Sequence, residues 1–160
     1  DVAALAADPA ALDTVAAWLA DAVATLPGPP VTAIVTVESG GIVFAAAAQQ
    51  RLAQRLPLVT VRKGGAELPP TATATHPGSN ATRRATTLTL GAARLAPGSR
   101  VVVIDDVVAS GATAAAVCDL VERSLRCTVA AVVTPVEFPL CRADGGLRCA
   151  VRSMLKFPGR

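Results

Sequence analysis

Short apolar runs alternate with amphipathic stretches along most of the chain. The apolar runs are rich in β-branched residues and occupy residues 31–37, 57–63, 100–105 and 127–136. Such runs are typical of strands covered on both faces of a parallel sheet. The amphipathic stretches repeat apolar residues every three or four positions and occupy residues 9–26, 42–56 and 112–125. We therefore expect one α/β domain over residues 1–160, with an open, mainly parallel twisted sheet flanked by helices.

Local signals predict where several elements begin and end. Asp8 before Pro9 predicts the start of the first helix, as an N-cap followed by proline in the first turn, and the sequence LPGPP predicts its end. Two shorter strands are expected at 85–91 and, at an edge of the sheet, at 149–155. The segment 64–84 is rich in Gly, Pro, Thr and Ser and shows no helical period, so we expect a functional loop or a disordered segment there.

The composition narrows the classes of partner. The net charge is only +3, and no basic tract with interleaved aromatic residues occurs, which argues against nucleic acid and suits a small phosphorylated ligand. The four cysteines form no C-x-x-C pair, and a single histidine completes no zinc pattern, so we expect free thiols in a reducing cytosol. No segment predicts a signal peptide or a membrane span. These features predict a cytoplasmic protein.

Three strand ends carry polar residues and glycines, and open α/β sheets bind ligands at the carboxyl ends of their strands. These ends read ESGG, RKGG and DDVVASGAT. In the last, small residues let backbone N–H groups close around an anion at the start of the following helix, and Ser110 and Thr113 add hydroxyl donors. The carboxylates of Asp105 and Asp106 can accept the two hydroxyls of a ribose diol. The pattern predicts a phosphate-binding loop; the alternative is an ordinary aspartate-rich turn with a helix N-cap.

This last stretch, VVVIDDVVASGAT, resembles the motif with which type I phosphoribosyltransferases bind 5-phosphoribosyl 1-pyrophosphate (PRPP). The chain around it is similar to the adenine phosphoribosyltransferase branch: VTVESGGIVFAAAAQQRLAQRLPLVTVRKGGAELP follows that branch's strand, glycine-containing turn, helix and RK-G-LP segment. The resemblance covers nearly all of the chain. It implies transfer of the 5-phosphoribosyl group from PRPP to a nitrogen of an adenine-like purine with release of pyrophosphate, as in purine salvage.

The resemblance also implies a partner for each part of PRPP. Asp105 and Asp106 would be the catalytic residues that bind the ribose 2′- and 3′-hydroxyls. The residues around the 5′-phosphate would be Ala109, Ser110, Gly111, Ala112 and Thr113. The residues toward pyrophosphate would be Ser39, Gly40, Lys63 and Arg62, with Arg83 as a further cation. Mg²⁺ would be carried by PRPP, with no metal held by the protein alone, and the family implies a homodimer.

The sequence departs from the family pattern at three places. Gly40 stands where the family usually has an arginine, so one cation for pyrophosphate is missing. Thr82 and Arg83 stand where the family has a Glu-Tyr pair, and neither replaces a carboxylic acid in general acid–base catalysis. The family's N-terminal hood, which contacts the base, would precede Asp1 and is expected to be reduced or absent. Two alternatives therefore stay open: a PRPP- or nucleotide-binding regulatory protein without transferase activity, and a transferase for a non-standard base.

Overall fold

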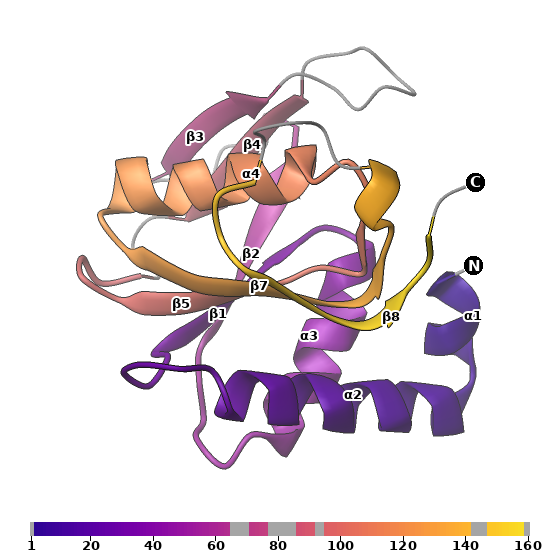
Figure 1. The fold of residues 1–160 in the computed structure, drawn as a ribbon. Coiled ribbons are helices and arrows are strands. Elements are labelled where there is room, and N and C mark those ends of the chain that lie inside the picture. The colour runs from indigo at the N-terminus through magenta and orange to yellow at the C-terminus, as the bar shows by residue number, and fades with distance from the viewer. Residues whose placement is uncertain (1, 65–70, 77–85, 92–94, 142–146, 159–160) are drawn as a thin grey trace.

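The structure is a computed structural model with a central sheet between two layers of helices (Figure 1). It describes residues 2–64, 71–76, 86–91, 95–141 and 147–158. The helices and helical turns are α1 (Val2–Ala7), α2 (Pro9–Ala24), α3 (Gly40–Arg51), α4 (Ala112–Asp119), the π-helical turn η2 (Leu120–Ser124) and the 3₁₀ turn η3 (Pro139–Cys141). The strands are β1 (Ala33–Val37), β2 (Leu58–Lys63), β3 (Thr71–His76), β4 (Thr86–Gly91), β5 (Arg100–Ile104), β6 (Val107–Val108), β7 (Thr128–Glu137) and β8 (Val151–Lys156).

The sheet is mainly parallel, as the sequence predicts. Its strand order is β3-β4-β2-β1-β5-β7-β6, and β8 pairs with β7. All pairs among β1, β2, β5, β6, β7 and β8 are parallel, whereas β4 runs antiparallel to β2 and to β3. The β1–α3–β2 and β5–α4–β7 connections are the βαβ units that the alternation of strands and helices predicts.

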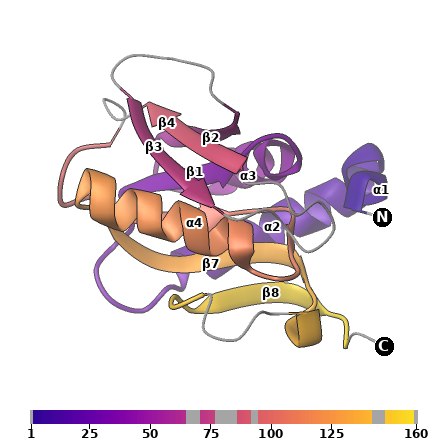
Figure 2. The same ribbon diagram turned by 90° about the horizontal axis from the view of Figure 1, so that it is seen from above.

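Alternate residues of the central strands face opposite helical layers. In β1, Val35 and Val37 belong to the apolar cluster that includes α4, whereas Ile34 belongs to the cluster that includes α2 and α3. In β5, Val103 and Ile104 divide between the two clusters in the same way. Figure 2 shows α4 crossing the face of the sheet opposite α2. Because both faces are covered, the central strands are mostly apolar.

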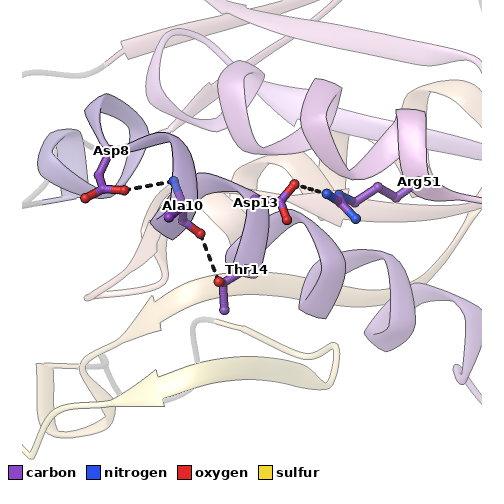
Figure 3. Close-up of polar contacts among 5 residues, drawn as sticks. All are labelled: Asp8, Ala10, Asp13, Thr14 and Arg51. Carbon is purple, nitrogen blue, oxygen red and sulfur yellow. Dashed lines mark hydrogen bonds and ion pairs between the residues drawn. The ribbon is translucent and has the colours of Figure 1, made fainter.

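The first long helix begins where the sequence predicts. The Asp8 carboxylate accepts hydrogen bonds from the N–H groups of Ala10 and Ala11 at 2.8 and 3.0 Å, and Pro9 occupies the first turn (Figure 3). An ion pair between Asp13 of α2 and Arg51 of α3 joins the two helices of this layer. Among the described residues, no helix is long and apolar enough to cross a membrane.

Two expectations about local structure are wrong in detail. Residues 71–76, placed in a segment without regular structure, form β3, because the alternating threonines of TATATH pair along the whole of β4. The helix expected at 42–56 is α3, which begins at Gly40 and ends at Arg51. Leu52 already has an extended backbone, and the chain runs from there toward Pro57, which disfavours helix in the residue before it.

Candidate functional site

The carboxyl ends of β1, β2 and β5 meet at one edge of the sheet because the three strands are parallel neighbours. Thr36 of β1 lies beside Thr60 of β2 on one side and beside Ile104 of β5 on the other. Lys63 ends β2, and Asp105 follows β5 directly. The three polar strand ends that the sequence singles out are therefore brought together in space.

Asp105 is the buried carboxyl group of this edge, with 7% of its surface exposed. Its Oδ1 accepts a hydrogen bond from the backbone N–H of Asp106 at 3.1 Å. Burial, followed by the negative charge of Asp106, raises the pKa of Asp105 from its usual 3.8 to about 7, against the opposing effects of that N–H and of the Lys63 charge. A ligand that brings hydroxyl donors or positive charge would therefore stabilise the ionised form of Asp105.

The carboxylate of Asp106 lies over the first turn of α3. Its Oδ1 accepts a hydrogen bond from the N–H of Val107 at 2.9 Å, and its Oδ2 occupies the space into which a side chain at Gly40 would project. Ser39, the N-cap residue of α3, makes no capping hydrogen bond with its own side chain. An arginine at position 40 would have to displace the Asp106 carboxylate, so the missing cation and the orientation of Asp106 are linked in this chain.

Gly41 marks a close approach between α3 and the end of β5. A Cβ atom at this position would lie 2.7 Å from the Thr36 Oγ1, 3.2 Å from the Asp105 Oδ1 and 3.3 Å from the carbonyl oxygen of Ile104. The Thr36 hydroxyl in turn donates to that carbonyl at 2.8 Å. The turn after β1 thus packs directly against Asp105, and only glycine fits there without displacing buried atoms. The glycine doublet after the strand is the signal in the sequence that this packing requires.

The predicted phosphate loop leads from β6 into α4. Gly111, the N-cap residue, has φ +76°, in the left-handed region, and its carbonyl accepts a hydrogen bond from the N–H of Ala115 at 2.8 Å. Glycine offers no side chain to cap the helix, and the Ser110 hydroxyl accepts only a long, 3.4 Å hydrogen bond from the N–H of Ala112. The positive end of the helix dipole at α4 is therefore available to an anion, as the small-residue pattern predicts.

The two cationic residues at the end of β2 have different surroundings. The Arg62 Nε lies 2.9 Å from the Glu38 Oε1, so this pair joins the end of β2 to the turn after β1. Lys63 is exposed, and its charge acts on Asp105. Lys63 is therefore the more available of the two for a phosphate group. Through this ion pair, Glu38 braces the turn after β1.

A match to a known family model shows to which protein family the chain belongs. The family model of the phosphoribosyl transferase domain matches residues 1–137, which include both aspartates and the phosphate loop. The chain belongs to this family. The phosphoribosyltransferase class that the sequence predicts is thereby confirmed.

Curated phosphoribosyltransferases and solved structures are similar to the chain. The adenine phosphoribosyltransferase of Synechococcus sp. (strain JA-3-3Ab) is 37% identical over 78% of the chain and 67% of its own length. The xanthine phosphoribosyltransferase of Chloroflexus aurantiacus (strain ATCC 29364 / DSM 637 / Y-400-fl) is 39% identical over 66% of the chain and 49% of its own length. The matches thus span about half to two-thirds of these relatives.

A solved structure confirms the fold class of this phosphoribosyltransferase. The adenine phosphoribosyltransferase of Thermoanaerobacter pseudethanolicus superposes with a TM-score of 0.85 at 27% identity, over 98% of the chain and 87% of that protein. The resemblance to the adenine branch is therefore shown both by sequence and by structure. The roles of Asp105, Asp106 and the phosphate loop in binding PRPP stay predictions. Thr82 and Arg83 lie outside the described residues.

Glu137 is a buried residue near the site that the sequence analysis did not single out. It ends β7, is 3% exposed, and lies beside Val108 of β6, next to the phosphate loop. The Ser153 hydroxyl donates to its Oε2 at 2.5 Å, and the Lys156 Nζ lies 3.9 Å from the same oxygen. Glu137 thereby anchors β8 to the strand beside the loop. An acidic residue directly after an apolar run, the same signal that marks Asp105, could have identified it.

Proposed function

We propose that this protein transfers the 5-phosphoribosyl group of PRPP to a ring nitrogen of a purine base. The bond between ribose C1 and the pyrophosphate oxygen breaks, and a bond between C1 and the purine nitrogen forms. The nitrogen loses its proton, and pyrophosphate leaves with the electron pair of the broken bond. The expected acceptor is adenine, as in purine salvage, since the adenine branch gives most of the similar proteins.

The observation that carries this proposal is the placement of two carboxylates beside an uncapped helix N-terminus. Asp105 and Asp106 follow β5, and the loop that begins with Val107 reaches the N-cap Gly111 within a few residues. A ribose 5-phosphate combines a diol with an anion in one small molecule. The carboxylates can accept its 2′- and 3′-hydroxyls, while the N–H groups of the loop and of α4 receive the phosphate.

The remaining residues of the edge suit the leaving group. Lys63 supplies a positive charge, and the turn at Ser39 and Gly40 supplies backbone N–H groups at the start of α3. Developing negative charge on pyrophosphate would be stabilised there, while positive charge develops on the ribose ring near the two aspartates. Catalysis would then rest mainly on positioning and on electrostatic stabilisation, without a covalent intermediate.

Mg²⁺ would enter as part of the substrate, bound to PRPP. Within the described residues, no group of three or more His, Cys, Asp or Glu side chains is arranged to hold a metal ion. The carboxylates of Asp105 and Asp106 are hard oxygen donors, which suit an ion that keeps most of its ligands from phosphate and water. In that position Mg²⁺ would neutralise charge on the pyrophosphate group.

The acceptor base, the assembly and the location belong to the proposal as well. Adenine is the first candidate, and the similarity to a xanthine phosphoribosyltransferase makes xanthine the second. A homodimer in the cytoplasm is expected from the family resemblance. Sedimentation of the purified chain tests the oligomeric state directly.

The decisive experiment measures pyrophosphate release. The protein is incubated with PRPP and Mg²⁺ in the presence of adenine, xanthine, hypoxanthine or guanine, each against a control without base. We expect release with adenine and formation of the matching nucleotide. Calorimetric titration with PRPP in the same buffer measures binding separately. Binding without release for every base would overturn the transferase and favour the regulatory alternative, whereas release only with a different base would identify a non-standard acceptor.

A further inference from the structure

Two cysteines that are 31 positions apart meet beside the helix that carries the phosphate loop. The Cys118 Sγ, on α4, lies 2.9 Å from the Cys149 Sγ, in the segment before β8. Neither cysteine is part of a disulfide bond. Figure 1 shows the chain that leads into β8 (yellow) passing alongside α4 (orange). Disulfide bonds have a sulfur–sulfur length of about 2.0 Å, so small side-chain shifts would bring these two atoms to bonding distance.

A surface cavity gives small molecules access to this pair. The cavity has a volume of about 360 Å³ and lies where α4 and η2 meet Val129 of β7 and the segment before β8. Its lining includes Ala115, Cys118, Asp119, Arg148 and Cys149. Cys118 is buried at 7% exposure, whereas Cys149 is half-buried, so a solvent-borne reagent meets Cys149 first.

The surroundings of the two thiols also set an order of reaction. The hydrogen bond to the Cys149 sulfur raises the pKa of Cys118, and burial and the negative charges of Glu122 and Asp119 act in the same direction. Cys118 thus keeps its proton until its partner has reacted. Cys149 is the attacking thiol and Cys118 the resolving one.

The same segment runs close to the phosphate loop. A Cβ atom added at Gly111 would lie 3.6 Å from the Cβ of Leu147, so Leu147 stands beside the open side of this glycine. Cys149 follows Leu147 by two residues, and the carbonyl of Ala150 accepts a hydrogen bond from the N–H of Val132 in β7 at 2.9 Å. A bond between the two sulfurs would therefore tie α4 to a segment that lies beside the N-cap of α4.

We propose that Cys118 and Cys149 form a reversible intramolecular disulfide when the protein meets a peroxide, and that this bond holds the phosphate loop in its binding conformation. The Cys149 thiolate attacks one oxygen of hydrogen peroxide, the O–O bond breaks, and a sulfenic acid and hydroxide form. The hydroxide takes up the proton that the Cys149 thiol released and becomes the first water. The Cys118 sulfur then displaces hydroxide from that sulfenic acid, and a proton converts it to a second water. Two thiols are oxidised, the peroxide is reduced, and a dithiol reductant reverses the step.

The bond would act on ligand binding through Leu147. Holding the segment of Leu147 beside Gly111 would restrict the motion of the loop, so less ordering is left to PRPP when it binds. We expect oxidation to tighten PRPP binding by about threefold and to raise the melting temperature by roughly 10 °C. The disulfide itself does not depend on the proposed function, since its formation is measured without substrate.

The test uses the full chain with Cys141→Ser, which removes the exposed thiol that could link two molecules. This protein is treated with a modest excess of hydrogen peroxide under native conditions. We expect a mass loss of about 2 Da, a fall from three titratable thiols to one, and a peptide that joins Cys118 to Cys149. The matched control adds Cys118→Ser and should keep a reactive Cys149 without the mass loss.

Each result bears on the proposal. Alkylation of both Cys118 and Cys149 after peroxide treatment, or a linkage through Cys127 instead, would overturn the disulfide. Inorganic phosphate and PRPP are then titrated into the oxidised and reduced forms. Equal affinities in the two forms would overturn the coupling to the loop, whereas a lack of PRPP binding in both forms, with the disulfide formed, would refute the proposed function and leave the disulfide standing.

Discussion

Two strand-to-helix turns stand side by side at the ligand edge of the sheet, and they are built differently. The turn after β1 has two residues, Glu38 and Ser39, before α3 begins at Gly40, and its glycines allow close packing. The turn after β5 takes seven residues to reach α4 and uses Gly111 for a left-handed backbone. Neither helix has a side-chain N-cap hydrogen bond.

The difference separates two tasks. The long turn carries backbone N–H groups, the Ser110 hydroxyl and two carboxylates, which suits holding ribose 5-phosphate. The short turn has no open space at Gly40, since the Asp106 carboxylate lies there. We therefore expect the long turn to bind ribose 5-phosphate, and the short turn to position the two aspartates and to offer only backbone N–H groups to pyrophosphate.

The largest effect is expected from removing charge on the long turn. Asp106→Asn leaves the shape of the side chain but removes a charged acceptor for a ribose hydroxyl, which is worth about 2.7 kcal/mol or roughly 100-fold in PRPP affinity. Calorimetric titration with PRPP measures this. Asp21→Asn, on the exposed surface of α2, is the matched control and should bind as the unmodified protein does. Unchanged affinity in Asp106→Asn would refute the ribose assignment.

A second substitution tests whether the short turn is a packing device. Gly41→Ala places a methyl group 2.7 Å from the Thr36 Oγ1 and 3.2 Å from the Asp105 Oδ1, within buried surroundings. Overpacking of this kind should lower the free energy of unfolding by about 2 kcal/mol, as measured by urea denaturation.

Gly40→Ala is the matched partner of that substitution. Its methyl group meets the Oδ2, Cγ and Cβ atoms of one side chain, Asp106, and no backbone atom. That carboxylate must rotate and give up its hydrogen bond from the Val107 N–H, so the stability loss should be about 1 kcal/mol, less than for Gly41→Ala. If the two variants lose equal stability, the packing account of Gly41 is wrong.

The sequence predicts the features of this edge that depend on neighbouring residues, and it does not predict those that depend on contacts between distant segments. The strand ends and the predicted phosphate loop are recognised from local patterns, namely an apolar run, two carboxylates and small residues before a helix. These segments lie at the carboxyl edge of the sheet, as expected. The pairing of Cys118 with Cys149 and the approach of Gly41 to Asp105 depend on contacts between distant segments. No local spacing encodes such contacts, because they arise only when the sheet and helices pack. The strand at 71–76 was missed for a similar reason, since its partner β4 decides its conformation.

A third prediction concerns the buried carboxyl group between the two turns. In the folded protein the pKa of Asp105 is about 7, above its usual 3.8, so the folded state binds the extra proton between these values. Stability should therefore fall as the pH rises from about 4 to 7 and then level off. A neutral amide does not titrate, so the stability of Asp105→Asn relative to the unmodified protein should rise by about 1.4 kcal/mol for each pH unit between about 4 and 7 and then stay level.

Urea denaturation across that pH range, on both proteins, measures the difference. Subtracting one free energy of unfolding from the other at each pH cancels the contribution of every group that titrates alike in the two proteins. A stability gap that stays constant with pH would show that Asp105 titrates as it does in the unfolded chain, and would contradict its burial as the source of the shift.

The smallest effect is expected from substituting Gly111, the glycine of the long turn. This substitution tests whether Gly111 contributes to PRPP binding. Gly111→Ala must hold alanine at φ +76°, which should cost about 1 kcal/mol of stability, and the added methyl lies in ordinary contact with Leu147. Gly98→Ala imposes nearly the same backbone strain, at φ +82°, with nothing within 4 Å of its Cβ. Gly98 precedes the amino end of β5, whereas the phosphate loop follows its carboxyl end. The two variants should lose similar stability in urea, yet only Gly111→Ala should bind PRPP more weakly, by roughly fivefold. Equal PRPP affinity in both variants would mean that the left-handed residue serves the fold alone, and that the long turn is no more specialised for binding than the short one.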